Sequence, residues 1–323
     1  MASLTVQESE IYDRQIRLWG IEAQQRLQSS RVLMAGRFSA TSAEISKNLV
    51  LAGFSATIMD SGLTTAEDLG ANFLYNESSV GKNRAESAHE RLQELNPMVK
   101  VTTSTQPTTS ITSEFINVEK YNVVVLSGPV SMSEMIRINQ ECRETNSDCA
   151  FFYVDMFGFL GVGFSDLGPN FSYRSGSVEA GNEKLIPVKF STIETTLSTP
   201  WSELSSRRFG TPPIYYAWNC LLQHKELEQE EAPAIQAFGV ELSQKEGDVD
   251  GKLLDNKVLD IMMNCYGRDV GAACAIMGGL MGQEIVKSIA RKSKPLQNVF
   301  MLDSFGQVSR GGVQCTIVPP SLK

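Results

Sequence analysis

The chain has few of the side chains that build metal sites. Among its 323 residues there are two histidines, His89 and His224, and six cysteines, none of which forms a C-x-x-C pair. Structural zinc sites need closely spaced cysteine and histidine ligands, so the sequence predicts no metal site. Both histidines fall in polar helical stretches without an acid or base at a fixed spacing, and we expect them at the surface.

Long apolar runs and an excess of basic residues are also missing. No stretch reaches the ~18 apolar residues of a membrane span; residues 270–290 come nearest, but Gln283, Glu284 and Lys287 interrupt them. The 29 basic and 37 acidic residues give a net charge of −8. This argues against nucleic-acid binding, which needs a basic face. With no signal peptide, we expect free thiols in a reducing compartment: the nucleus, and the cytoplasm as well.

One turn is short of glycine. Residues 31–53 read RVLMAGRFSATSAEISKNLVLAG, which predicts a strand, a turn opened by Gly36 and an amphipathic helix ending at Gly53. Nucleotide-binding folds place several glycines in this turn, so that the backbone can approach phosphates at the helix N-terminus. Here Gly36 is followed by Arg37, Phe38, Ser39, Ala40 and Thr41. We predict a nucleotide-binding fold whose own pocket has lost its ligand.

Strand and helix patterns alternate along the first half of the chain. Strands are expected over residues 32–35, 56–59, 99–103, 122–126 and 150–154, and helices over 8–29 (one helix or two), 43–53, 83–95 and 132–145. This alternation indicates an α/β fold with a Rossmann-like open sheet, mostly parallel. We also expect a helix over 270–290, and antiparallel strands over 299–302 and 312–318 at the edge of the sheet. The small residues of that helix predict a closely packed neighbour: Ala275, Gly278, Gly279 and Gly282.

The pattern weakens between about 170 and 265. Charged residues dominate 225–231 (KELEQEE), and residues 243–252 are polar. We interpret residues 171–265 as a small insertion of helices and loops. Residues 1–170 and 266–323 then form one domain.

Several segments occur in a characteristic order: YDRQIRLWG (12–20), AQQRLQSSRVL (23–33), AEISKNLVLAG (43–53), MD (59–60), VGKNRAE (80–86), LNPMV (95–99) and CAIMGGLMGQEIVK (274–287). This succession resembles the ubiquitin-like-protein activating enzymes, which adenylate the C-terminus of ubiquitin or a relative. The segment YVDMFGFLGVGFSDLG (153–168) and the modest length most resemble the smaller, non-catalytic subunits that serve a SUMO-type modifier. The resemblance implies an adenylation-domain fold.

The sequence departs from active members of that family at four places in one pocket. The glycine turn is degenerate, and Asp60 precedes Ser61 where the family has a second aspartate for ribose and magnesium. GANFLY (70–75) lacks an Arg-Gln pair that contacts ATP, and LSGP (126–129) lacks an aspartate. The resemblance thus implies an inactive adenylation domain. Its former cofactor-binding residues are Gly36, Ser39, Thr41 and Asp60, while ATP and magnesium are bound by a larger catalytic partner in an obligate heterodimer.

Arg14 is the one residue to which the resemblance assigns direct chemistry. The family's arginine in this segment reaches the ATP bound by the other subunit. Adenylation expels pyrophosphate, and a guanidinium supplied in trans can neutralise the charge that builds there. We expect Arg17 to form a structural ion pair and Lys82 to be a surface residue.

No cysteine has the setting of the family's thioester nucleophile. Cys315 precedes Thr316, but it falls in an expected strand near the C-terminus, after Gln314. Cys142 and Cys274 lie within expected helices, where buried thiols are common. The modifier's thioester is therefore expected on the partner's cysteine.

Other functions stay open at this point. A regulatory subunit for a Nedd-type modifier belongs to the same class. A homodimeric adenylyltransferase for a small sulfur carrier would need the missing acids and glycines. An NAD-dependent oxidoreductase would need a working glycine turn. A scaffold without catalytic contribution differs from the preferred interpretation in the role of Arg14.

Overall fold

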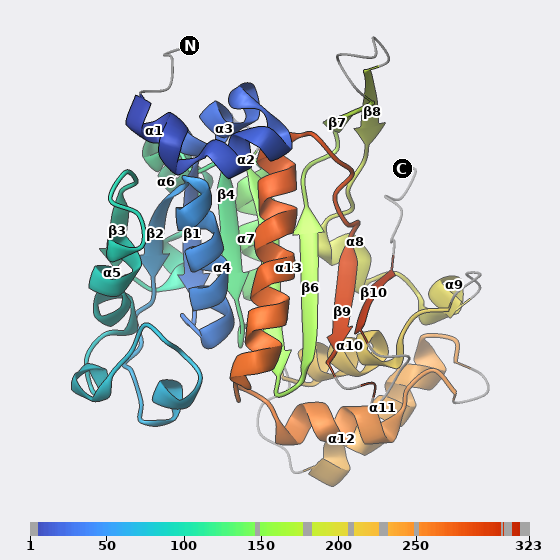
Figure 1. Cartoon of the computed structure of the whole chain (residues 1–323). Coiled ribbons are helices and arrows are strands. Elements are labelled where there is room, and N and C mark those ends of the chain that lie inside the picture. Colours follow the sequence, from blue (N-terminus) through green and yellow to red (C-terminus); the bar gives the residue numbers. More distant parts are fainter. Residues whose placement is uncertain are drawn as a thin grey trace.

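The computed structural model describes residues 6–145, 149–176, 183–205, 210–225, 232–248, 252–304, 306 and 312–316. Within this part, eight strands form one sheet in the order β10-β9-β6-β5-β4-β1-β2-β3 (Figure 1). Neighbours from β3 to β5 are parallel, whereas β6, β9 and β10 add antiparallel pairs. The predicted fold class, a mostly parallel Rossmann-like sheet with antiparallel edge strands, is confirmed.

The strands of this sheet are β1 (Arg31–Gly36), β2 (Ser55–Met59), β3 (Val101–Ser104), β4 (Val123–Ser127), β5 (Ala150–Phe157), β6 (Leu160–Asp166), β9 (Val299–Asp303) and β10 (Gly312–Thr316). β4, β5, β6 and β9 are buried along their whole length. Helices therefore cover the centre of the sheet on both faces, as parallel strands require.

One apolar cluster joins the sheet to the layer in front of it in Figure 1, which contains α4 (Ala40–Ala52), α5 (Arg84–Glu94) and α13 (Gly271–Ala290). A second cluster lies on the other face, with α6 (Ser113–Glu119), α7 (Met132–Arg143), α8 (Ile193–Leu197), α9 (Trp201–Ser205), α10 (Pro213–Lys225), α11 (Ala232–Lys245) and α12 (Asn256–Asn264). Short 3-10 helices occupy Glu67–Gly70, Glu77–Ser79 and Thr108–Ser110. None of the helices in the described ranges has the length and apolarity to cross a membrane.

The N-terminal segment forms three helices rather than one or two. α1 (Val6–Ile11), α2 (Asp13–Trp19) and α3 (Ile21–Gln28) lie across the amino ends of the parallel strands, at the top of Figure 1. The break between α2 and α3 falls at Gly20, whose φ of 86° is in the left-handed region. Glycine adopts this conformation without steric cost, so the sequence itself permits the turn.

The segment 171–265 contains a hairpin that the sequence analysis missed. β7 (Phe171–Ser175) and β8 (Lys184–Val188) pair antiparallel as a separate ladder. Helices α8 to α12 make up most of the rest. The acidic run from 226 to 231 lies outside the described residues, and the division into domain and insertion stays a prediction.

The expectation that both histidines lie at the surface is wrong for His224. This side chain is buried, and its ring meets that of Phe238 edge-on with centroids 5.4 Å apart. α10 packs against α11 and α12, and a polar local pattern cannot reveal that contact. His89 is half-buried, with Nε2 3.1 Å from the carbonyl oxygen of Val101.

The predicted close neighbour of the small-residue helix is α4. A Cβ at Gly278 would lie 2.4 Å from the Cβ of Glu44, and one at Gly282 would lie 3.0 Å from the Cβ of Asn48. Gly279, by contrast, has nothing within 4 Å of such an atom. The glycines at 278 and 282 thus allow the two backbones to approach.

Gly278→Ala is expected to destabilise the protein by about 1–3 kcal/mol, because the added methyl group must displace α4. Gly279→Ala is the matched control. It should be neutral or stabilise by up to ~1 kcal/mol, since alanine favours a helix. Urea unfolding of both variants measures the difference, and equal stabilities would contradict the packing argument.

Candidate functional site

The candidate site lies at the carboxyl ends of β1, β2 and β4, where open α/β sheets bind their ligands. Gly36 ends β1 and pairs in register with Ser127, the last residue of β4. Asp60 directly follows β2, and Asp155 lies on the neighbouring strand β5. Topology therefore brings together residues from four segments of the chain.

Gly36 is required by the packing of the sheet. Its φ is 91°, and a Cβ there would lie 2.3 Å from the carbonyl oxygen of Ser127. A side chain at this position would separate β1 from β4. The glycine that survives in the turn therefore has a structural reason independent of any phosphate.

Ser39 and Thr41 begin α4 rather than line an open cradle. Ser39 is the N-cap, and its Oγ accepts a hydrogen bond from the backbone N–H of Ser42 at 3.2 Å. This is an ordinary stabilising cap. Its Oγ is also 3.4 Å from that of Ser127, and Thr41 is buried.

Side chains of the protein itself occupy the place where a phosphate would lie. The carboxylate of Asp269 accepts a hydrogen bond from the backbone N–H of Ala40, the first residue of α4, at 3.0 Å. Arg37 lies beside it, with Nη2 3.9 Å from Asp269 and 2.9 Å from Asp68, and Nη1 2.6 Å from the carbonyl oxygen of Gly267. A helix N-terminus attracts an anion, and here the anion is internal.

Asp60 is also committed to internal contacts. Its Oδ2 accepts from the backbone N–H of Phe38 at 2.8 Å, and its Oδ1 accepts from Gly62 at 2.7 Å. Arg84 lies 3.5 Å from Asp60 and 3.4 Å from Asp68, so it joins the two acids. Asp60 thus helps to hold the turn closed.

These contacts leave no open space at the turn itself. The space among Arg37, Ser39, Ser127, Asp155 and Asp269 does not admit even a water molecule. The described residues also contain no group of three or more histidine, cysteine or acidic side chains placed to hold a metal ion. Among the described residues, the turn therefore offers neither space for a phosphate nor a ready set of ligands for magnesium.

The electrostatics of the cluster favour its charged state. Burial alone would lower the pKa of Arg37, but Asp269 and Asp68 outweigh burial and the pKa is raised. Burial alone would raise the pKa of Asp68, but hydrogen bonds from Thr65 and Arg37 outweigh it and the pKa is lowered. The ion pairs remain charged at neutral pH.

Arg14 lies far from this site. It is exposed on α2, and its neighbour Tyr12 packs against Gly53, at the C-terminal end of α4. The 13 residues of α4 separate that end from the turn by about 20 Å at 1.5 Å per residue. Arg14 cannot reach its own chain's turn.

The other charged side chains of these segments lie where the sequence indicated. Arg17 pairs with Asp13 at 3.0 Å, as predicted, and Lys82 is exposed.

Cys142 and Cys274 are buried in α7 and α13, which confirms them as core thiols. Burial raises the pKa of Cys274 to about 11, so the thiol stays protonated at neutral pH. A thiolate nucleophile needs the opposite shift. Cys315 belongs to β10, but its side chain lies outside the described part.

Sequence reasoning missed the two acids that close the pocket. Asp68 and Asp269 are separated by about two hundred residues, and neither stands in a recognisable motif. The only available signal was the arginine in place of a glycine at position 37. A buried arginine requires acidic partners, but their positions follow only from the fold.

Comparison with known proteins agrees with this architecture. A model of the ThiF family matches residues 12–310. SUMO-activating enzyme subunit 1B-1 of Arabidopsis thaliana is 35% identical over 316 residues, which cover 93% of this chain and 94% of that protein. SUMO-activating enzyme subunit 1 of Bos taurus is 33% identical over 342 residues, covering 97% and 96%. The Mus musculus protein is 34% identical over 334 residues, covering 94% and 93%. The chain therefore belongs to the ThiF family.

Proposed function

We propose that this chain is the non-catalytic subunit of a heterodimeric SUMO-activating enzyme. The pair adenylates the C-terminus of a SUMO-type modifier with ATP and magnesium held by the larger subunit, whose cysteine then takes the modifier as a thioester. The chain alone is inactive. We also propose that the protein acts in the nucleus and that some of it is in the cytoplasm.

The observation that carries the proposal is the closed turn. The carboxylate of Asp269 holds the backbone N–H of Ala40, and Arg37 fills the space beside it. A bound triphosphate would have to displace both side chains and leave buried charges unpaired, which is strongly unfavourable. Relatives named as SUMO-activating enzyme subunits align with nearly the whole chain. This favours a SUMO-activating complex for this chain as well.

Arg14 supplies the catalytic contribution in this proposal. It is exposed, makes no ion pair with any described residue, and lies at the opposite end of α4 from its own pocket. An exposed guanidinium without an acidic partner is available to a neighbouring subunit. In the adenylation step it would neutralise the pyrophosphate leaving group, as arginine fingers do in phosphoryl transfer.

An apolar face gives the partner a place to dock. Leu18 on α2 is 78% exposed, and Leu51 on α4 and Ile276 on α13 are 43% and 49% exposed. A groove between these helices is lined by Leu18, Trp19, Leu51, Gly279 and Val286, among others. Obligate interfaces bury large apolar surfaces of this kind, and Arg14 lies on the same helix as Leu18.

The test compares the chain alone with the chain co-expressed with a larger catalytic subunit. Calorimetry should show no ATP binding by the chain alone up to about 1 mM. Modifier-dependent ATP–pyrophosphate exchange should appear only with both subunits present. One-site ATP binding by the isolated chain, or exchange by it, would refute the proposal. It would support the rival interpretation, a homodimeric sulfur-carrier adenylyltransferase.

The same exchange assay identifies the modifier. A SUMO-type protein should support exchange, and a Nedd-type protein should not. The reverse result would assign the chain to a Nedd-type activating enzyme.

A further inference from the structure

A second cavity lies at the amino ends of the parallel strands, opposite the closed turn. It measures about 520 Å³ and is lined by side chains of α3, the β7–β8 hairpin and the C-terminal end of α13. Its volume is in the range of small-molecule sites. Nothing in the proposed function uses it.

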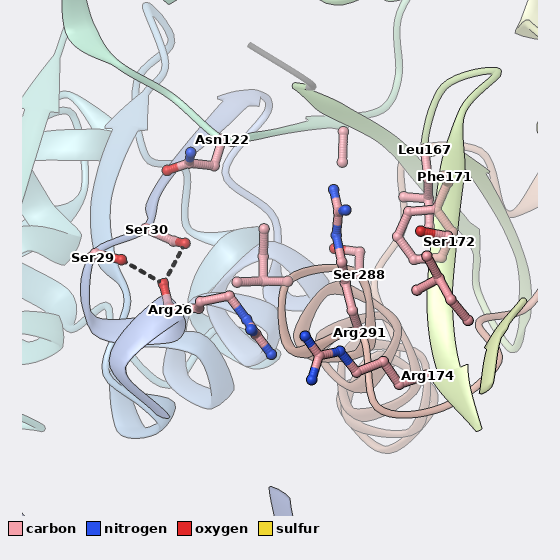
Figure 2. A pocket seen from close by; sticks show the side chains of 13 residues that line it. Arg26, Ser29, Ser30, Asn122, Leu167, Phe171, Ser172, Arg174, Ser288 and Arg291 are labelled. Carbon is pink, nitrogen blue, oxygen red and sulfur yellow. Dashed lines mark hydrogen bonds between the residues drawn. The ribbon is translucent and has the colours of Figure 1, made fainter. Parts of the chain in front are cut away.

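Three arginines from separate parts of the chain line this cavity. Figure 2 shows the guanidinium groups of Arg26 and Arg174 close to one another, while that of Arg291 extends toward Phe171 on another side of the cavity. No acidic residue lines the cavity within the described part of the chain. Glu183 lies 3.4 Å from Arg174, but it is shared with Lys292 at 3.6 Å. Positive charge is therefore concentrated in the cavity.

The arginines are held in position by other contacts. Nη2 of Arg26 donates to the carbonyl oxygen of Ala290 at 2.7 Å. The backbone N–H of Arg174 donates to the carbonyl oxygen of Arg291 at 2.8 Å. The guanidinium of Arg291 lies over the ring of Phe171, 5.4 Å from its centroid. A preorganised arrangement of donors loses little entropy when an anion binds.

One donor in the group remains unused. Nε of Arg26 is buried and makes no hydrogen bond among the described residues. Burial lowers the pKa of Arg26, and the neighbouring charges of Arg174 and Arg291 lower it further, against the opposing effect of Glu22. A buried, unsatisfied donor and neighbouring like charges are both costly unless an anion compensates them.

We propose that this cavity binds the phosphate group of a small phosphomonoester. The guanidinium groups match phosphate oxygens in geometry and charge. Leu167, Leu185 and Ile289 are among the apolar residues of the lining, against which the organic part of the ester packs. The volume exceeds that of a free phosphate ion, which favours an ester over the ion alone.

A simpler alternative is that the arginines only compensate the C-terminal end of α13. Arg26 does contact a carbonyl oxygen there, and cations favour that end of a helix. That role predicts no anion binding, so the two interpretations differ in a direct measurement.

The test is calorimetric titration of the full-length chain with phenyl phosphate, inorganic phosphate and sulfate. Phenyl phosphate should bind with a Kd below about 1 mM, and more tightly than either inorganic ion. Arg174→Ala should weaken binding about tenfold or more, since it removes a charged donor pair. Lys100→Gln, which removes an exposed charge elsewhere, should leave the affinity unchanged.

Ser172→Asp is a second variant, which shows whether a loss of binding in Arg174→Ala could reflect unfolding. Ser172 lines the cavity, and a carboxylate there would pair with the arginines, abolish phosphate binding and raise the melting temperature. The proposal is overturned if phenyl phosphate does not bind, or if Arg174→Ala and Lys100→Gln bind it equally. A phosphoserine peptide that binds at least about tenfold more tightly than phenyl phosphate would also overturn it, in favour of a protein ligand.

Discussion

Replacing Arg14 with alanine is expected to slow modifier-dependent ATP–pyrophosphate exchange by the assembled enzyme by about 10²-fold. The loss of one charge-stabilising donor at a leaving group has effects of this size, and arginine fingers reach larger ones. Arg14 is exposed and contributes no ion pair to the described part of its own chain, so the variant should fold and assemble normally.

Two controls separate the role in trans from general surface charge. Arg17→Ala removes a second exposed arginine of α2, which is already paired with Asp13. The exchange rate should change less than twofold, because an exposed ion pair contributes little free energy. Arg14→Lys keeps the charge but loses the planar fork of donors, and should fall between alanine and arginine. If Arg14→Ala exchanges at the wild-type rate, the chain contributes support only and the scaffold interpretation stands.

Asp68→Asn is expected to destabilise the isolated chain by about 3–5 kcal/mol near neutral pH. Asp68 is 4% exposed and accepts hydrogen bonds from Arg37 at 2.9 Å and from the backbone N–H of Thr65 at 2.8 Å. The amide keeps the shape but removes the negative charge between Arg37 and Arg84. Of their ion pairs in the described part of the chain, the two largely buried guanidinium groups would then keep those with Asp60 and Asp269, and Arg37 would also keep the weaker attraction of Asp155.

The pH dependence of this effect follows from the lowered pKa of Asp68. Its ordinary value is 3.8, and the folded state binds the proton less readily than the unfolded state. The stabilisation is therefore fully present above pH ~4 and is lost as the pH falls through the folded value. Wild-type protein should lose more stability than Asp68→Asn between about pH 4 and pH 2.

Urea unfolding across that pH range measures both effects. Asp13→Asn is the control, because it breaks an exposed pair that contributes about 0–1 kcal/mol. Equal stability of wild type and Asp68→Asn at pH 7, or parallel pH profiles, would show that the cluster does not hold the turn closed.

Much of the fold was predictable because it depends on local patterns. Apolar runs and alternating helical periods indicated the strands from β1 to β5 and the helices α4, α5 and α7, but not the short helix α6 between β3 and β4. Gly36 marked the turn, and the missing glycines after it led to the prediction that this turn no longer cradles a phosphate. The ordered segments from 12–20 to 274–287 also sufficed to indicate the family, since each is a short stretch read without knowledge of contacts.

Contacts between distant residues could not be obtained in this way. Asp269 reaches Ala40 across 229 positions, and Arg26 reaches Ala290 across 264. His224 has polar neighbours in the sequence, yet it is buried by α11. The linear order of residues determines the local conformation and which side chains the protein has for longer-range contacts. Which charges meet, which pocket is filled and which cavity stays open follow from how the helices pack on the two faces of the sheet, because burial and Coulomb energy depend on distances in space.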